Sequence, residues 1–241
     1  MRTRSFPTVA ALEVPHRFGA INAQRAEVER LISDSPGVDL VLLSECAITG
    51  YVSPVGDFDL RRFAEPIDGA TGAQFAELAR RYDVAIAGPI IEQVSSDTFN
   101  AHVVWDRGGN RIAHYRKRHP WIPETWASPG DLRPPLFELG GAIFTLAICF
   151  DLHFLANDAA SELAAADVLL FPSAWTEEGA DSRDELLPAL AQEFEIAVVN
   201  ANWGVGAPLV EGQGASRIID RRGRELVRAD GVRRIISAAL E

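Results

Sequence analysis

Three side chains capable of chemistry stand where predicted strands end: the carboxyl group of Glu45, the ammonium group of Lys117 and the thiol of Cys149. In α/β proteins, sites gather at strand ends, so this shared placement is more informative than any single residue type. A free thiol is only a few per cent thiolate near neutral pH, and it becomes an effective nucleophile when a base stands close by. The three residues therefore indicate a candidate site for nucleophilic thiol chemistry.

The stretch IFTLAICFDLHFLANDA, residues 143–159, predicts a buried strand that runs into Cys149 and a helix that begins just beyond it. Six of the seven residues 143–149 are apolar, counting Cys and Ala, and such a short run is typical of a strand buried on both faces. Unpaired N–H groups at a helix start carry partial positive charge. A thiol at this strand-to-helix turn would thus have an oxyanion site supplied partly by the backbone.

Each of these residues also has an ordinary interpretation. Non-disulfide cysteines are usually small buried apolar residues, which would suffice for Cys149. Glu45 could be solvated, and Lys117 could belong to an exposed basic run, RKR. Cys46 should point away from its neighbour Glu45 if the strand continues, which would place it in the core.

The elements that would position these residues alternate between strands and helices, which predicts an α/β fold with a mixed sheet. Five prolines between residues 120 and 135 mark a long irregular passage up to residue 136, and such loops are usually functional or disordered. With 241 residues and no linker, we expect one domain over 1–241. The pattern predicts strands over 9–14, 38–43, 84–91, 143–149, 167–175 and 196–202, hairpins turning at 106–110 and 221–223, and helices over 21–32, 72–82, beyond Cys149 to 166, and 186–194.

Composition excludes several classes of protein. The net charge of -11 and pI of about 5.0 argue against a nucleic-acid partner, which needs clustered Lys and Arg. No window holds about 18 uninterrupted apolar residues, and the opening MRTRSFPTVAALEV has no long apolar core, so we expect neither a membrane span nor a signal peptide. Two cysteines do not form a disulfide framework, and we expect a cytoplasmic protein.

No cofactor or metal is indicated by the sequence. His114 and His119 have no third ligand at convincing spacing for zinc. The segment GVGAPLVEGQG lacks both the glycine spacing and the preceding βα context of a dinucleotide-binding fingerprint.

Three segments carry a resemblance to a known family. LLSECAITGY, HYRKRHPW and LAICFDLHF resemble the signature blocks of the nitrilase, or carbon–nitrogen hydrolase, superfamily, which carry a Glu, a Lys and a Cys in this order. The resemblance extends from Val9 through GASRIIDRRGREL to Leu226. It implies a four-layer α-β-β-α sandwich with mixed sheets that forms a homodimer or a larger assembly.

The resemblance also implies roles for individual residues. Glu45 is similar to the family's general base, Lys117 to the cation that stabilises the oxyanion, and Cys149 to the nucleophile. Glu124, in WIPETWASPGD, is similar to a second glutamate that orients the substrate and the lysine.

Two more residues are expected around the substrate. The N–H of Phe150 would be a second oxyanion donor, and Trp175 would line the acyl side of the pocket, although core packing is an equally ordinary role for a tryptophan. His153, Leu155 and Ala156 stand where many members have an Arg and a Pro-Glu pair. Because these positions shape the pocket mouth, the departure leaves the substrate open.

The expected activity is hydrolysis of a small linear amide through a thioester, with release of ammonia or an amine. A nitrilase acting on a C≡N group and a catalytically silent scaffold of the same fold are the alternatives. CFDLHFLANDAA, FPSAW and LLPALAQEF look closest to the vanin and biotinidase branch, although the secretion signal, cysteine content and additional C-terminal domain of those proteins are not expected here.

Overall fold

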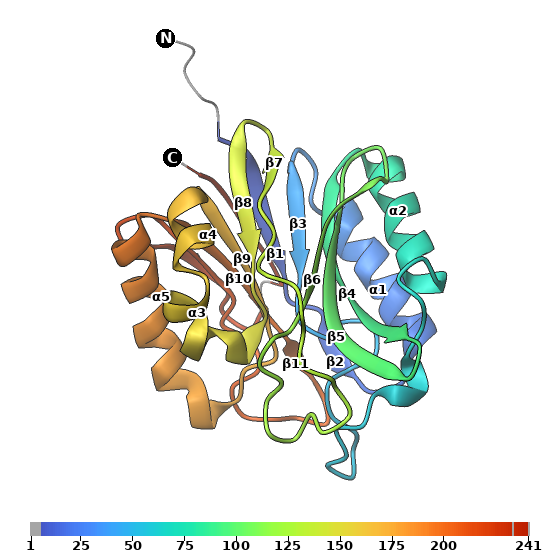
Figure 1. Cartoon of the computed structure of the whole chain (residues 1–241). Coiled ribbons are helices and arrows are strands. Elements are labelled where there is room, and N and C mark those ends of the chain that lie inside the picture. The colour runs from blue at the N-terminus through green and yellow to red at the C-terminus, as the bar shows by residue number, and fades with distance from the viewer. Residues whose placement is uncertain (1–5, 233, 241) are drawn as a thin grey trace.

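Two six-stranded sheets pack face to face in the computed structural model, which describes residues 6–232 and 234–240 (Figure 1). Arg2 and Arg4, part of the opening stretch considered for a signal peptide, lie outside the described residues.

The first sheet has three parallel strands at its centre and antiparallel strands at its edges. Parallel pairing joins β1 to β3 and β3 to β4, whereas β14, β5 and β6 each pair antiparallel with their neighbours. The order is β14 (Ile235–Ala239), β1 (Thr8–Leu12), β3 (Leu40–Leu43), β4 (Ala85–Val94), β5 (Asp97–Trp105) and β6 (Arg111–Arg116).

The second sheet repeats this plan. Parallel pairing joins β8, β9 and β10, and the outer strands β7, β12 and β13 run antiparallel to their neighbours. The order is β13 (Glu225–Arg228), β12 (Arg217–Ile219), β10 (Ala197–Asn202), β9 (Val168–Ser173), β8 (Ala142–Leu146) and β7 (Phe137–Leu139). A separate parallel pair joins β2 (Pro15–Arg17) to β11 (Gly204–Ala207).

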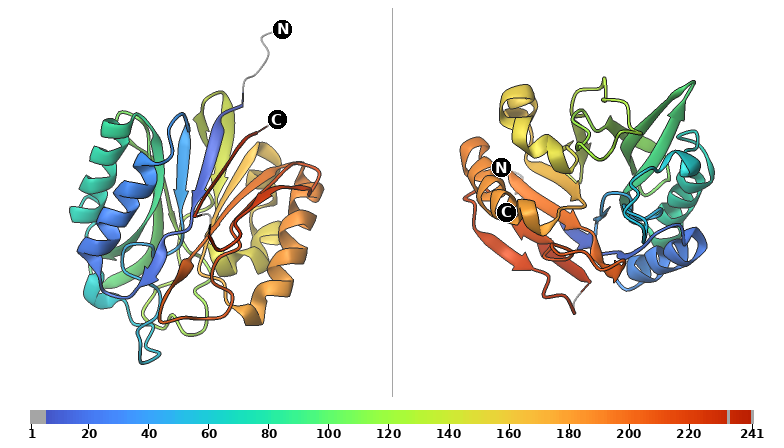
Figure 2. Two further views of the ribbon diagram at one scale, coloured as in Figure 1. Left: turned by 180° about the vertical axis from the view of Figure 1, so that it is seen from behind. Right: turned by 90° about the horizontal axis from the view of Figure 1, so that it is seen from below.

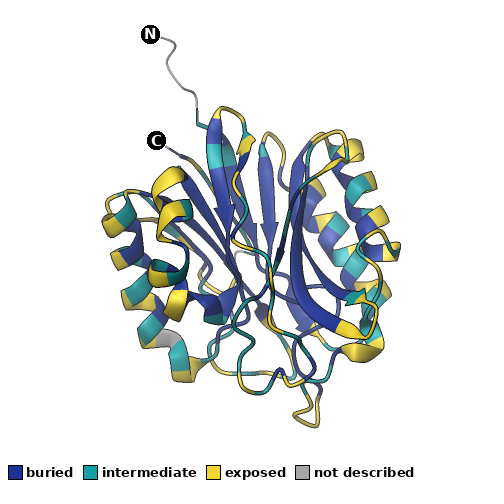
Figure 3. Ribbon diagram, viewed as in Figure 1, coloured by how far each residue is buried: buried dark blue, intermediate teal, exposed yellow. Residues whose placement is uncertain are grey.

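Helices cover the outer face of each sheet, which completes the predicted four-layer α-β-β-α sandwich (Figures 1 and 2). The first sheet carries α1 (Ile21–Ser33) and α2 (Ala70–Tyr82), and the second carries α3 (Leu152–Asp158), α4 (Ala160–Ala165) and α5 (Ala180–Phe194). Three single 3₁₀ turns lie at Arg61–Phe63, Cys149–Asp151 and Glu177–Gly179. Figure 3 shows buried strands between helices whose outer faces are exposed.

Both faces of the central strands are buried, because one faces the other sheet and the opposite one faces helices. In β1, Val9 and Ala11 belong to the core that joins the two sheets, whereas Ala10 and Leu12 belong to the core beneath α1 and α2. Alternate side chains of a strand point to opposite faces, so both sets must be apolar. This explains the uninterrupted apolar runs of the sequence.

Most predicted elements are present, and one prediction was wrong. The helix expected to run unbroken to residue 166 is interrupted at Ala159, where the backbone leaves the helical region at φ -137° and ψ 27°. No Gly or Pro marks that break, and the surrounding alanines favour helix. The strand before Glu45 ends at Leu43, as predicted, and Cys46 lies beyond it with a positive φ of 52°.

Among the helices of residues 6–232 and 234–240, none has both the length and the apolar character needed to cross a membrane.

Candidate active site

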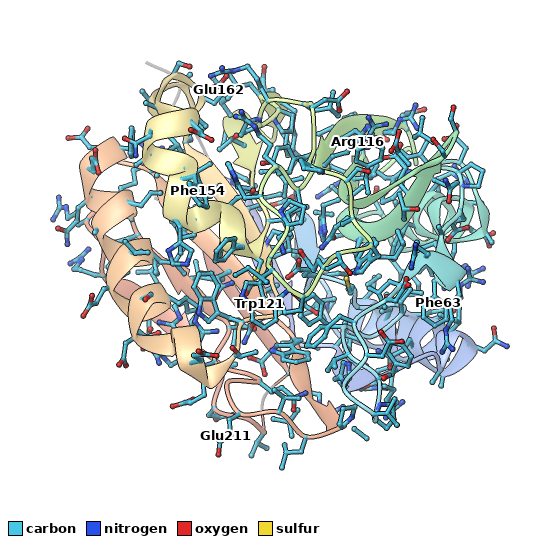
Figure 4. The ribbon with its side chains drawn as sticks, turned by 60° about the horizontal axis from the view of Figure 1, so that its bottom comes forward. Phe63, Arg116, Trp121, Phe154, Glu162 and Glu211 are labelled. Atoms are coloured by element: carbon cyan, nitrogen blue, oxygen red, sulfur yellow. The ribbon has the colours of Figure 1, made fainter. Side chains whose placement is uncertain are left out.

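The three predicted residues lie at one end of the sandwich, on both sheets. Glu45 follows β3, Lys117 follows β6 and Cys149 follows β8. Because β6 is antiparallel to β5 and β5 is antiparallel to β4, β6 runs in the same direction as β4. Its C-terminal end therefore lies at the same end of the first sheet as those of the parallel strands. Figure 4 shows this end of the molecule, with Trp121 near the middle of the view.

Lys117 is enclosed between two carboxylates. Its Nζ lies 2.7 Å from Oε1 of Glu45 and 2.8 Å from Oε2 of Glu124, and none of the three side chains is exposed to solvent. The amide of Asn100, on β5, donates to Oε1 of Glu45 at 2.7 Å and to Oε1 of Glu124 at 3.1 Å. Sequence reasoning missed Asn100, since a lone Asn within an apolar strand carries no recognisable signal.

The irregular passage after β6 delivers Glu124 to this cluster. The backbone N–H of Trp121 donates to Oε2 of Glu124 at 2.8 Å, and the N–H of Glu124 donates to the carbonyl of Trp121 at 2.7 Å. Farther along, the N–H of Gly130 donates to the carbonyl of Lys117 at 2.8 Å. These hydrogen bonds fix the path of the proline-rich passage around Glu124 and at Gly130.

Cys149 occupies a sharp turn between β8 and α3. Its φ is +46°, in the left-handed region that residues other than Gly seldom adopt. Such a conformation costs on the order of 1–3 kcal/mol, and it persists only where surrounding contacts enforce it. The turn confirms the predicted strand-to-helix position of the thiol, whereas its left-handed backbone was not foreseen.

Asp151 supplies contacts that enforce this turn. Its Oδ2 accepts hydrogen bonds from the hydroxyl of Tyr115 at 2.9 Å and from the N–H of Ile148 at 3.1 Å. Its Oδ1 accepts hydrogen bonds from the N–H groups of Arg118 and His119 at 3.1 and 2.9 Å. Since those two residues directly follow Lys117, one buried carboxyl group joins the cysteine turn to the lysine segment.

The thiol of Cys149 is a neighbour of the Glu45 carboxylate. The N–H of Ala174 donates to Oε2 of Glu45 at 2.9 Å. Burial and, next, the charge of Glu45 raise the pKa of the Cys149 thiol well above its ordinary value, although Lys117 and the Ala174 N–H act in the opposite direction. At neutral pH the resting site therefore holds a thiol, and forming a thiolate requires a base.

The charges around Lys117 favour its ammonium form. Burial alone would disfavour that form, but the carboxylates of Glu124 and Glu45 raise the pKa of Lys117 well above its ordinary value. Burial raises the pKa of Glu124, and Lys117 opposes that shift. Lys117 thus stays protonated between two acidic groups, and this keeps a positive charge fixed beside the thiol.

A pocket of about 500 Å³ opens onto Cys149, and Phe150 and Trp175 are among its lining residues. Trp175 is only 5% exposed, so it serves both as pocket wall and as core. The backbone N–H of Trp175 donates to Oδ1 of Asn202 at 2.8 Å. Gly179 packs closely against the indole, because a Cβ there would lie 2.3 Å from Nε1 of Trp175.

The remaining candidates have other surroundings. Cys46 is 2% exposed and lies in an apolar cluster with Tyr51, as expected of a core residue. Nε2 of His114 lies 2.8 Å from Glu92, and Nε2 of His119 lies 2.9 Å from Asp158.

Two mixed sheets lie between helix layers, and a cysteine lines a pocket at their strand ends; this is the architecture of the nitrilase superfamily. The chain belongs to the carbon-nitrogen hydrolase family, whose model matches residues 8–241.

Similar proteins include several amidases. The 2-oxoglutaramate amidase of Bacillus subtilis is 26% identical over 238 residues, which cover 97% of this chain and 90% of that protein. A hydrolase encoded in the pqqF 5' region of Pseudomonas protegens is 28% identical over 198 residues, or 81% of this chain and 69% of that one. A cysteine-to-alanine mutant of the Nesterenkonia AN1 amidase from the nitrilase superfamily superposes with a TM-score of 0.84 at 22% identity, over 98% of this chain and 92% of that one. At that identity, the structural likeness shows the fold.

Proposed function

We propose that this protein is a cysteine-dependent amidase that hydrolyses a small linear amide through a thioester. The observation that carries the proposal is the fully buried Lys117, which is held between the carboxylates of Glu45 and Glu124 near the pocket residue Cys149. Burying charged groups carries a large desolvation cost even when they are paired. Groups with strongly perturbed pKa values also cluster at functional sites.

In the first step, Glu45 accepts the thiol proton as the sulfur of Cys149 bonds to the amide carbon. Because the pKa of the thiol is raised, a base must take its proton before or during the attack, and Glu45 is the proposed base. Negative charge moves to the substrate oxygen. Lys117 and the N–H of Phe150 are the proposed donors to that oxygen, in the manner of an oxyanion hole.

In the second step, Glu45 returns the proton to nitrogen, the C–N bond breaks, and ammonia or an amine leaves. The Cys149 thioester remains. Glu45 then takes a proton from water, whose oxygen attacks the thioester carbon. The C–S bond breaks, the thiol regains its proton, and the carboxylic acid leaves, so atoms and charges balance over the cycle.

Glu124 and Asn100 are proposed to position the base and the cation. Asn100 donates to both glutamates, which holds the two carboxylates at a fixed separation around Nζ of Lys117. Without Glu124, the ammonium of Lys117 would have one carboxylate partner and would be free to move toward Glu45. Its distance from the substrate oxygen would then be less defined.

The test is release of ammonia or amine from a panel of linear amides, ureas and nitriles, with Cys149→Ala as the blank. Cys46→Ala is the matched control, because it removes the other buried thiol. We expect Cys149→Ala to abolish turnover without unfolding the protein and Cys46→Ala to retain most activity. Mass spectrometry of the wild type quenched with a slow amide should show an acyl adduct on the Cys149 peptide.

Three results would contradict the proposal. Equal losses in both variants at unchanged thermal stability would remove Cys149 from the chemistry. An adduct with nitriles but never with amides would identify a nitrilase. No turnover and no adduct with any compound would favour a silent scaffold of the fold.

A further inference from the structure

We propose that the substrate carries a positive charge on the end distant from the amide, as in a linear amide with a terminal ammonium group. This inference rests on the proposed amidase function. Its support is the chemistry of the pocket wall beyond Cys149.

The charged residues along the pocket wall indicate the sign of the charge on the substrate. The titratable residues that line the pocket are Tyr51, Cys149, His153 and Glu178. Burial lowers the pKa of His153 from its ordinary value of 6.5, so its imidazole is neutral at pH 7. Burial raises the pKa of the Tyr51 hydroxyl and of the Cys149 thiol well above their ordinary values. The carboxylate of Glu178 is therefore the one charged group among these lining residues.

Five of the other lining residues carry aromatic rings, which form two groups. Tyr51 and Trp121 stack with centroids 6.4 Å apart, and His153 contacts Phe150 and Trp175 with centroids 4.9 and 5.6 Å away. An ammonium group is attracted to aromatic faces, above all to that of tryptophan, whereas a carboxylate is repelled by them. Aromatic walls and a carboxylate thus favour the same charge on the ligand.

Arg183 is the cation that could reverse this preference. It directly follows Ser182, which lines the pocket, yet Arg183 is 3% exposed and is not among the lining residues. Its Nε lies 3.7 Å from Oδ1 of Asp184, and neither Nε nor Nη1 has a hydrogen-bond partner among the described residues. A carboxylate on the substrate would have to reach Arg183 past the pocket wall, whereas an ammonium meets Glu178 on that wall.

The experiment compares three amides of equal length that differ only at the far end: 5-aminopentanamide, hexanamide and 5-carbamoylpentanoate, which are cationic, neutral and anionic. We expect kcat/KM for the cationic amide to exceed that for the neutral one by about tenfold, the combined effect of an exposed charge pair and an aromatic contact. The anionic amide should be the poorest of the three.

Glu178→Gln tests the residue, and Glu177→Gln is its matched control, because Glu177 is an exposed neighbour that does not line the pocket. In Glu178→Gln the ratio of cationic to neutral kcat/KM should fall by about threefold, and Glu178→Lys should lower it further. The ratio should stay at the wild-type value in Glu177→Gln.

A neutral amide that is hydrolysed as well as the cationic one would overturn the inference and leave the amidase function standing. So would a preference for the anionic amide, which would point to Arg183. Equal ratios in Glu178→Gln and Glu177→Gln would also overturn it. If no amide of any charge is hydrolysed, the amidase proposal fails, and the inference about its substrate fails with it.

Discussion

Replacing Asp151 by Asn changes one atom of the group that joins the cysteine turn to the lysine segment. The two oxygens of the Asp151 carboxyl group accept four hydrogen bonds, three of them from backbone N–H groups. An Asn can orient its oxygen toward Arg118 and His119 and its NH₂ toward Tyr115, whose hydroxyl can turn to accept. The N–H of Ile148 then faces a donor and loses its partner.

The cost follows from these contacts. A buried N–H without a partner costs about 1–3 kcal/mol, and the remaining bonds to Asp151 lose the advantage of a charged acceptor, worth about 1 kcal/mol each. Burial raises the pKa of Asp151, which shows that its charge is itself costly and that Asn would recover part of this loss. The net destabilisation should be about 3 kcal/mol, or roughly a 6–12 °C decrease in Tm for a domain of this size.

The assay combines thermal and urea unfolding with single-turnover kinetics. Tyr115→Phe is the control, because it removes one of the four donors and should cost about 1 kcal/mol. At temperatures where Asp151→Asn remains folded, acylation should still be at least about tenfold slower, because the cysteine turn and the lysine segment are no longer held together. An Asp151→Asn protein that matched the wild type in both Tm and acylation rate would refute this account of the turn.

Three further outcomes are expected. Lys117→Met should reduce amide turnover by at least about 10²- to 10³-fold in pre-steady-state assays, since it removes the proposed oxyanion donor, and a loss below tenfold would contradict that role. Burial opposes ionisation of Glu92, but hydrogen bonds from His114 and Arg116 lower its pKa to about 2, below the ordinary 4.5. The stabilisation from this shift is fully present above pH 4.5 and disappears as pH falls toward 2, so Glu92→Gln should flatten the acid limb of the stability curve. An unchanged acid limb would assign acid unfolding to other groups. Light scattering should detect a homodimer or a larger assembly at micromolar concentration, as the family resemblance implies, and a monomer of 26.2 kDa alone would contradict it.

Much of the fold could be predicted because two packed sheets demand strands that are apolar on both faces. The run over residues 40–43 is an example, since both its neighbouring layers exclude water. Elements that depend on distant partners could not be predicted. Strand β14 becomes a strand by pairing with β1 at the opposite end of the chain, and the turn at Ser95 adopts a positive φ without Gly or Asn.

In the candidate site, too, some features could be predicted from the sequence and others could not. The positions of Glu45 and Cys149 at strand ends could be predicted because apolar runs reveal where strands stop, and that of Lys117 because it ends the second arm of a predicted hairpin. The contacts of Asn100 and Asp151 could not, because their partners Glu45 and Tyr115 are 55 and 36 residues away in sequence. The first contact forms when strands of the first sheet align, and the second forms when the two sheets pack together.

The division of the site between two sheets has a consequence for the newly made chain. The first sheet carries the proposed base and cation, whereas the second carries the thiol, so neither sheet alone holds an activated nucleophile. Burial and the charge of Glu45 favour the protonated form of the Cys149 sulfur. On the proposed mechanism, the thiol therefore gains its base only when the two sheets have packed together, and a nascent or partly unfolded chain carries a thiol without that base.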